Sequence, residues 1–239
     1  MIIQPLNLVH ILTILIIPTL CFLAINYGLR HRSEAAQIKA LTIICIVNAF
    51  LYFVYKIAKA NDPSSDFDIF YNLPLHFCNI NLILLPVAIK LKSKCLMAYQ
   101  YYFGTALAAL AILVVDDTFR GQSIFGFTAL VYFYYHSMLI IIPLALAKFG
   151  LFRPSFKLVW QPAALLVVLT GVIHLVNVAF RATGLAEGAN YFFTFGLRGN
   201  ILTEIFWWII PYPFFFLIPS IITFVPYIIV LTLPFYKRK

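Results

Sequence analysis

The sequence predicts an all-α polytopic membrane protein, with seven transmembrane helices in a single bundle domain that spans residues 1–239. Composition is the first reason: 63% of the residues are hydrophobic and only 10% are charged, against roughly 25% charged residues in an ordinary soluble domain. The second reason is that the apolar residues form long runs, and a crossing of the hydrocarbon layer needs about 20 residues. These features exclude a soluble enzyme, and the richness in aromatic residues excludes a disordered chain.

Seven apolar runs are long enough to cross a membrane, and we expect each to be helical because hydrocarbon forces backbone hydrogen bonds to close within a segment. The first run lacks a basic leader and a small-residue cleavage site, so we expect it to be a retained helix. Alternation typical of a transmembrane β-barrel is absent. The predicted spans cover residues 8–29, 38–58, 69–89, 96–115, 124–147, 158–180 and 205–235.

Charged residues predict the orientation. The loops after the first, third, fifth and seventh runs hold twelve of the 17 basic residues, and Glu34 is the one acid among them. The opposite loops hold the other seven acids. The positive-inside rule therefore predicts an outer N-terminus and a cytoplasmic C-terminus in a multi-pass membrane protein, for which a plasma membrane is the default location. The net charge of +9 is explained by these loops, and no basic helix or finger spacing indicates binding to nucleic acid.

Two further segments stand out near the end of the chain. Residues 184–200 contain four glycines and an aromatic cluster, so we expect an outer-face lid, a short re-entrant segment or an ordinary surface loop. The last predicted span contains five prolines, which kink or interrupt helices. Residues 207–213 are rich in tryptophan, tyrosine and proline, which predicts an aromatic belt at the outer membrane surface.

Strongly polar residues inside spans are costly, so each is a candidate for function. The alternative is that they form hydrogen bonds between helices. No charged residue lies near the middle of a span, which argues against a proton pump or a charge-coupled transporter. The candidates are Asn72, His76, Cys78, Asn79 and Asn81 on the third span, His136 on the fifth, and His174 and Asn177 on the sixth.

Depth in the membrane singles out one of the four cysteines. From the helical rise, Cys78 lies roughly 13 Å below the outer boundary, His136 roughly 18 Å and His174 roughly 9 Å. The other cysteines, Cys21, Cys45 and Cys95, fall in the cytoplasmic halves among apolar residues and are predicted to be small core residues.

A cysteine acts as a nucleophile when a base lies within hydrogen-bond reach, and His136 is the best placed by depth. We expect His76 to share a helix face with Asn72 and Asn79, a polar stripe suited to a lipid headgroup. Pro74 can open the helix in this segment and expose backbone groups toward a cavity. Asn81, Asn177 or His76 could donate to an oxyanion. Local spacing does not support a zinc site at these histidines and Cys78, so neither a metal nor another cofactor is predicted.

The segment Leu73-Pro74-Leu75-His76-Phe77-Cys78 resembles the Leu-Pro-Leu-His-Leu-Cys signature of the YwaF-like bacterial integral membrane proteins. Asn190-Tyr191 and the later Pro211-Tyr212-Pro213 resemble two further motifs of that family. The family is similar to animal transmembrane acyltransferases that act on phospholipids through a cysteine, and more distantly to the androgen-inducible-gene hydrolases. The resemblance implies that Cys78 is the nucleophile and His136 the base, with His76 as the histidine of the signature.

We therefore predict an intramembrane acyl-transfer enzyme whose partners are membrane lipids, either a cysteine acyltransferase or a fatty-acyl ester hydrolase. Cys78 and His136 are the predicted catalytic residues. The alternative is a non-catalytic transporter or a lipid- or solute-binding membrane protein that uses the same polar cavity. The predicted substrate-binding residues are Asn72, His76, Asn79, Asn81, His174, Asn177, Asn190 and Tyr191.

Overall fold

The structure is a computed structural model that describes residues 1–62, 67–114, 121–196 and 217–236. The chain divides into two compact units. The first unit comprises Met1–Phe67 and Cys78–Arg153, and the second comprises Asp68–Phe77 and Pro154–Lys239.

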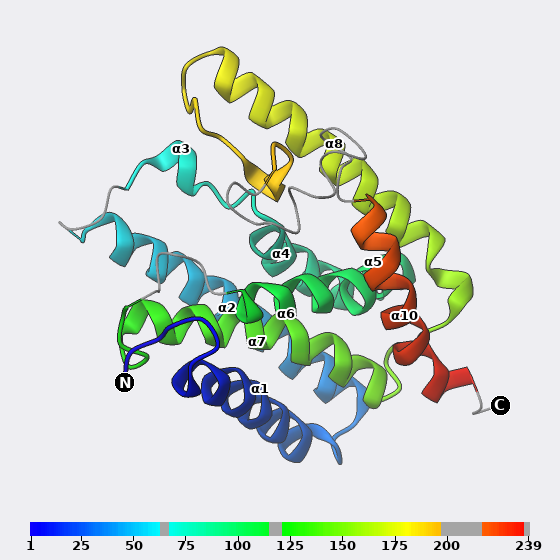
Figure 1. Cartoon of the computed structure of the whole chain (residues 1–239). Coiled ribbons are helices and arrows are strands. Elements are labelled where there is room, and N and C mark those ends of the chain that lie inside the picture. The colour runs from blue at the N-terminus through cyan, green and yellow to red at the C-terminus, as the bar shows by residue number, and fades with distance from the viewer. Residues whose placement is uncertain (63–66, 115–120, 197–216, 237–239) are drawn as a thin grey trace. The chain divides into compact units, whose positions relative to one another are not determined.

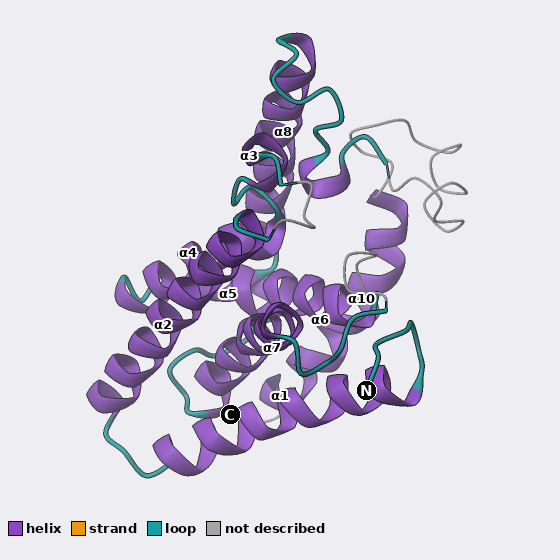
Figure 2. Ribbon diagram, turned by 90° about the vertical axis from the view of Figure 1, so that its left-hand side faces the viewer, coloured by secondary structure: helices purple, strands orange, loops and turns teal. Residues whose placement is uncertain are grey.

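Helix α7 is the central element of the first unit. Helices α1, α2 and α6 all pack against it, as does the π-helix that joins α5 to α6 (Figures 1 and 2). Residues on every side of α7 are buried, including Tyr135, His136 and Ser137. The helices of this unit are α1 (Leu8–Leu29), α2 (Glu34–Ala60), α4 (Phe77–Lys90), α5 (Lys94–Tyr99), the π-helix (Gln100–Gly104), α6 (Thr105–Leu113) and α7 (Phe127–Lys148).

Hydrogen bonds from polar side chains to backbone carbonyl oxygens join these helices to one another. The Tyr132 hydroxyl of α7 donates to Ala111 O of α6 at 2.7 Å. Asn48 Nδ2 of α2 donates to Tyr135 O at 3.3 Å. His10 Nδ1 accepts from the Leu6 amide at 3.0 Å, so its Nε2 carries the proton and donates across to Ile112 O at 2.7 Å. Such bonds are a common way of joining helices in an apolar environment.

The second unit is built around one long helix, α8. It contains α3 (Ile69–Asn72), a 3-10 turn (Phe156–Leu158), α8 (Trp160–Ala182), a second 3-10 turn (Tyr191–Phe193) and α10 (Leu217–Tyr236). The second 3-10 turn folds back onto α8.

The described parts of the chain confirm the all-helical prediction, and they contain no strand beyond an isolated bridge between Ile2 and Ser123. Five helical segments are long and apolar enough to cross a membrane, and two shorter apolar helices accompany them. The long segments are Leu8–Leu29, Glu34–Ala60, Lys94–Leu113, Phe127–Lys148 and Phe156–Ala182.

The third predicted span, residues 69–89, is not one continuous helix. Helix α3 ends at Asn72, and α4 begins at Phe77. Pro74 disfavours helical geometry in the residue before it, and Leu73 accordingly has φ −56° and ψ 149°. Much of the last predicted span, including the expected aromatic belt at residues 207–213, lies outside the described residues.

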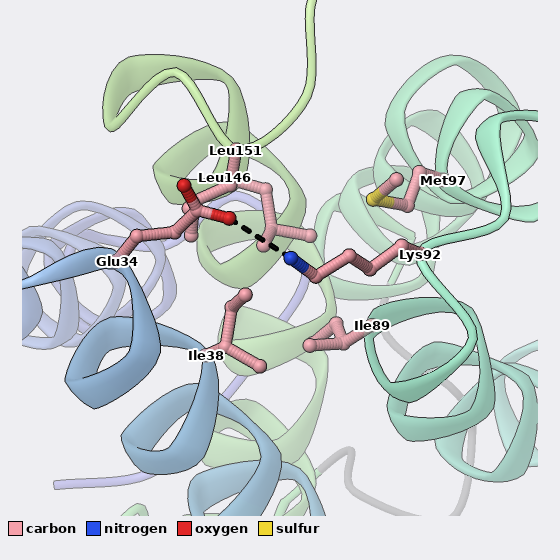
Figure 3. Close-up of a pocket in the computed structure, with 7 residues that line it drawn as sticks. All are labelled: Glu34, Ile38, Ile89, Lys92, Met97, Leu146 and Leu151. Atoms are coloured by element: carbon pink, nitrogen blue, oxygen red, sulfur yellow. Dashed lines mark hydrogen bonds and ion pairs between the residues drawn. The ribbon is translucent and has the colours of Figure 1, made fainter.

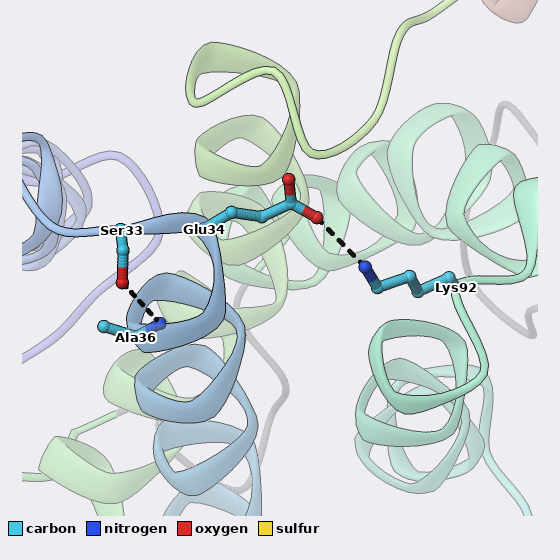
Figure 4. Close-up of polar contacts among 4 residues, drawn as sticks. All are labelled: Ser33, Glu34, Ala36 and Lys92. Atoms are coloured by element: carbon cyan, nitrogen blue, oxygen red, sulfur yellow. Dashed lines mark hydrogen bonds and ion pairs between the residues drawn. The ribbon is translucent and has the colours of Figure 1, made fainter.

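A single ion pair joins the start of α2 to the loop between α4 and α5. Lys92 Nζ lies 3.0 Å from Glu34 Oε1, and each side chain is about two-thirds exposed (Figure 4). Ile38, Ile89, Met97 and other apolar side chains line the small hollow around the pair (Figure 3). Exposed ion pairs contribute only about 0–1 kcal/mol, and Lys92 has the left-handed φ of +49° that favours glycine.

Substitution of Lys92 separates the ion pair from this backbone strain. We expect Lys92→Ala to lower the free energy of unfolding by less than about 1 kcal/mol, because only an exposed pair is lost. We expect Lys92→Gly to be about 1 kcal/mol more stable than Lys92→Ala, because glycine adopts a positive φ without steric cost. Reversible unfolding in detergent micelles measures both, with Glu34→Ala as the control for the pair alone. A cost of several kcal/mol for Lys92→Ala would contradict this expectation.

Candidate active site

Cys78 is the second residue of α4 and lies in the first turn of that helix. It is partly exposed, as is Cys95, whereas Cys21 and Cys45 are buried. The break at residues 73–76 explains the position, because a continuous helix would have placed Cys78 in its middle. A helix N-terminus carries a partial positive charge that stabilises negative charge nearby.

Two tyrosines of the first unit, Tyr99 at the end of α5 and Tyr135 on α7, are buried. The Tyr135 ring packs on the ring of His136, with the centroids 4.0 Å apart. The predicted nucleophile Cys78 and the predicted base His136 both lie in the first unit.

The hydrogen bond that His136 makes selects its tautomer. His136 is only 2% exposed, and its Nδ1 lies 2.9 Å from Tyr132 O. A carbonyl oxygen can only accept, so Nδ1 carries the proton of the neutral ring and Nε2 carries the lone pair. In this tautomer Nε2 is the atom of His136 that can take up a proton.

Two of the predicted asparagines follow Cys78 on α4. Asn79 and Asn81 are both buried. Asn81 Oδ1 accepts a hydrogen bond from Gln100 Nε2 at 3.1 Å. Gln100 is the first residue of the π-helix, and helices of this kind occur frequently at functional sites.

The other predicted site residues lie in the second unit, where Asn177 fixes a loop to α8. Its Nδ2 donates to Tyr191 O at 2.8 Å and to Thr194 Oγ1 at 2.9 Å, and its Oδ1 accepts from Tyr191 N at 2.9 Å. His174 Nδ1 lies 3.0 Å from the same Thr194 hydroxyl. These contacts engage both amide hydrogens of Asn177.

Tyr191 in turn bridges the break that precedes Cys78. Its hydroxyl accepts from Leu73 N at 3.2 Å and donates to Phe70 O. Burial raises the pKa of the Tyr191 phenol, and the Asp68 carboxylate acts in the same direction, while the bond from Leu73 lowers it. The net shift is upward, so the phenol keeps its proton and the hydrogen bond to Phe70.

His76 lies in the break itself and packs against the loop. Its ring makes an edge contact with Tyr191, with centroids 5.0 Å apart, and a tilted contact with Phe193 at 5.5 Å. Phe192 and Phe193 have φ of 58° and 53°, a conformation that costs roughly 1–2 kcal/mol per residue. A pocket of about 200 Å³ opens here, lined by Tyr71, His76, Gly188, Ala189, Asn190, Tyr191 and Phe193.

The expected polar stripe of Asn72, His76 and Asn79 does not form, because residues 73–76 are not helical. Asn72 Nδ2 instead donates to Asp68 O at 2.8 Å at the start of α3. Asn190 is bonded within its own loop, with Nδ2 donating to Gly196 O at 2.7 Å. The candidates thus fall into a group around Cys78 in the first unit and a group around Tyr191 in the second.

Several neighbours of these candidates did not stand out in the sequence. Gln100 is an amide within an apolar span, so the criterion that selected the asparagines would have selected it as well. Tyr99, Tyr135 and Thr194 give no such signal, because tyrosine and threonine are common in spans. Among the described residues, no group of three or more His, Cys, Asp or Glu side chains is arranged to hold a metal ion.

Removal of the Tyr191 hydroxyl tests its role at the break. We expect Tyr191→Phe to lower the free energy of unfolding by about 1 kcal/mol or more, because it removes the hydrogen-bond partner of the part-buried Leu73 amide. Hydrogen exchange at Leu73 should accelerate. Tyr71→Phe is the matched control, because its hydroxyl accepts from Gly188 N at an exposed site. Equal effects of the two substitutions would contradict the assignment.

Comparison with known proteins identifies the family of the chain. No match was found among curated proteins or among solved structures. The model of the TMEM164 family matches residues 5–232, which is nearly the whole chain. With its long apolar helices, the chain is a multi-pass helical membrane protein that belongs to the TMEM164 family.

Proposed function

We propose that the protein is an intramembrane enzyme that transfers or hydrolyses acyl chains of membrane lipids, with Cys78 as nucleophile and His136 as base. The observation that carries the proposal is the position of the thiol: it lies in the first turn of α4, in the same compact unit as the buried His136. The resemblance of residues 73–78 to a signature related to cysteine acyltransferases supports the same chemistry.

The reaction begins when His136 Nε2 takes the thiol proton and the Cys78 sulfur attacks the carbonyl carbon of a lipid ester. The partial charge at the N-terminus of α4 stabilises the negative charge that the sulfur carries. The tetrahedral intermediate then expels the lipid alcohol, which takes the proton from His136. An acceptor hydroxyl, or water, releases the acyl chain from the resulting thioester and regenerates the thiol.

In this proposal the substrate is a membrane lipid, because the helices of the first unit are long and apolar enough to lie in the bilayer. The pocket of the second unit at Tyr71, His76 and Tyr191 is by itself a candidate for binding polar groups of lipids. Asn177 and His174 act by holding the loop that forms the wall of the pocket. No cofactor or metal takes part.

We also propose seven spans in the bacterial plasma membrane, with the N-terminus outside and the C-terminus in the cytoplasm. Two contacts support the alternation of the loops. The Glu34–Lys92 ion pair joins two loops that are both predicted to be cytoplasmic. The Ile3 amide donates to Gln122 O at 2.9 Å, which joins the N-terminus to a loop predicted to lie outside.

Reporter fusions test this topology. We expect a fluorescent protein fused after Lys148 to fold in the cytoplasm and emit light, and alkaline phosphatase fused after Arg181 to be active outside. The reason is that the basic residues of the loop between α7 and α8 keep that loop in the cytoplasm. The reverse pattern of activities would refute the proposed orientation.

Substitution of the nucleophile tests the chemistry. We expect Cys78→Ala and Cys78→Ser each to abolish labelling by a lipid-like acylating probe, detected as the mass of the acyl group on the intact protein. His136→Ala should slow labelling by about 10²–10⁴-fold, the usual contribution of a general base. Cys95→Ala is the matched control, because Cys95 is also partly exposed in the same unit.

Equal labelling of the wild type and both Cys78 variants would refute the proposal. A lipid or solute that still binds to Cys78→Ala, without acylation of the wild type, would instead support the non-catalytic transporter or binding protein.

A further inference from the structure

A pair of buried amides lies beside Cys78. The side chains of Asn81 and Gln100 are both fully buried, and Gln100 Nε2 donates to Asn81 Oδ1 at 3.1 Å. Asn81 belongs to α4 and Gln100 to the π-helix that continues α5. The bond therefore joins two helices in the interior of the first unit.

One hydrogen bond joins α4 to the end of α5 close to the thiol. Asn81, one turn after Cys78, accepts it from Gln100. Cys78 and Asn81 are three residues apart on one helix, so they lie on the same face with Cβ atoms about 5–6 Å apart. The amide pair and the thiol therefore occupy one neighbourhood.

The Asn81 amide keeps a donor that no hydrogen bond uses. Its Nδ2 is buried and has no partner among the described residues, and the same is true of Gln100 Oε1. The other buried amides with an unpartnered atom, Asn26 and Asn48, lack a partner only for their oxygen. A buried donor without a partner costs about 1–3 kcal/mol. The chain therefore keeps the unpaired Asn81 donor near the nucleophile at a cost in stability.

Gly104 provides the space around this pair. A Cβ atom at residue 104 would lie 2.7 Å from Gln100 Oε1 and 3.5 Å from Asn81 Nδ2. A side chain there would displace the Gln100 amide and would crowd the donor. The absence of a side chain at Gly104 thus lets the Gln100 amide keep its place and leaves Asn81 Nδ2 uncrowded on that side.

We infer that Asn81 Nδ2 is the oxyanion donor of the acyl-transfer reaction, and that Gln100 is the positioning residue that aims it. The inference rests on the proposed function. When the Cys78 sulfur bonds to the ester carbon, the carbonyl electron pair moves to the oxygen, and the Asn81 amide donates to that oxygen. When the carbonyl reforms, the bond to the lipid alcohol breaks and the alcohol takes its proton from His136.

Two reactions of the same thiol separate this role from simple packing. Acylation by p-nitrophenyl octanoate passes through an oxyanion, whereas alkylation by iodoacetamide displaces iodide and forms none. In the full-length protein in detergent, we expect Asn81→Leu to slow acylation by about 10²–10³-fold, as the loss of one oxyanion donor does. The rate of Cys78 alkylation should stay unchanged.

Gln100→Leu tests the positioning role. We expect it to lower kcat for the ester by up to roughly 10²-fold, because a misdirected group loses its contribution to the transition state, and to leave KM unchanged. Gln37→Leu is the matched control: Gln37 is a buried amide of the same unit, and its Nε2 donates to Leu29 O at 3.0 Å. We expect its acylation rate to equal that of the wild type.

The acylation and alkylation rates together distinguish failure of the Asn81 assignment from failure of the proposed function. Unchanged acylation of Asn81→Leu, with Cys78-dependent acylation of the wild type, would overturn the role of Asn81 and leave the proposed function intact. An equal loss in acylation and alkylation would assign Asn81 to packing and also overturn the inference. A wild-type protein that alkylates at Cys78 but does not acylate would refute the proposed function and the inference together.

Discussion

The backbone interruption at residues 73–76 is the constraint from which the rest of the site follows. Backbone groups freed from a helix need partners wherever water is scarce. Tyr191 provides them, because its hydroxyl accepts from Leu73 N and donates to Phe70 O. Tyr191 is itself held by two hydrogen bonds to the Asn177 amide, which also donates to Thr194. The loop on α8 thus stabilises an interruption that lies more than a hundred residues earlier in the chain.

The interruption changes what Cys78 is able to do. On an unbroken helix the thiol would lie between turns whose dipoles contribute little net charge at its position. Because α4 begins at Phe77, Cys78 lies at the positive end of the helix dipole, and Asn81 follows one turn later on the same face. Pro74 starts the interruption and Tyr191 maintains it, so neither residue needs to contact the substrate to matter for the proposed reaction.

Hydropathy predicted the long helices well, because burial in hydrocarbon depends on composition over a window rather than on particular partners. Helix α1 has the predicted bounds of Leu8–Leu29. The prediction that Asn72 and His76 share one helix face was wrong, because it assumed helical periodicity through Pro74. The sequence also placed Asn177 within the sixth span, without showing that its amide hydrogens bond to a loop of the same unit. Hydrogen-bond partners depend on tertiary packing, which periodicity does not encode.

The two buried histidines of the first unit show why residue type alone does not identify function. His10 and His136 are both nearly inaccessible, and each contacts a backbone carbonyl through one ring nitrogen. His10 also accepts from Leu6 N through its second nitrogen, so taking up a proton would cost it that bond. His136 donates through Nδ1 to the preceding turn, which leaves Nε2 as the basic atom of the ring. The same bond keeps the ring oriented when Nε2 gains a proton, because Nδ1 remains a donor in both states. A base that holds its orientation through the proton transfer is suited to return that proton to the leaving alcohol.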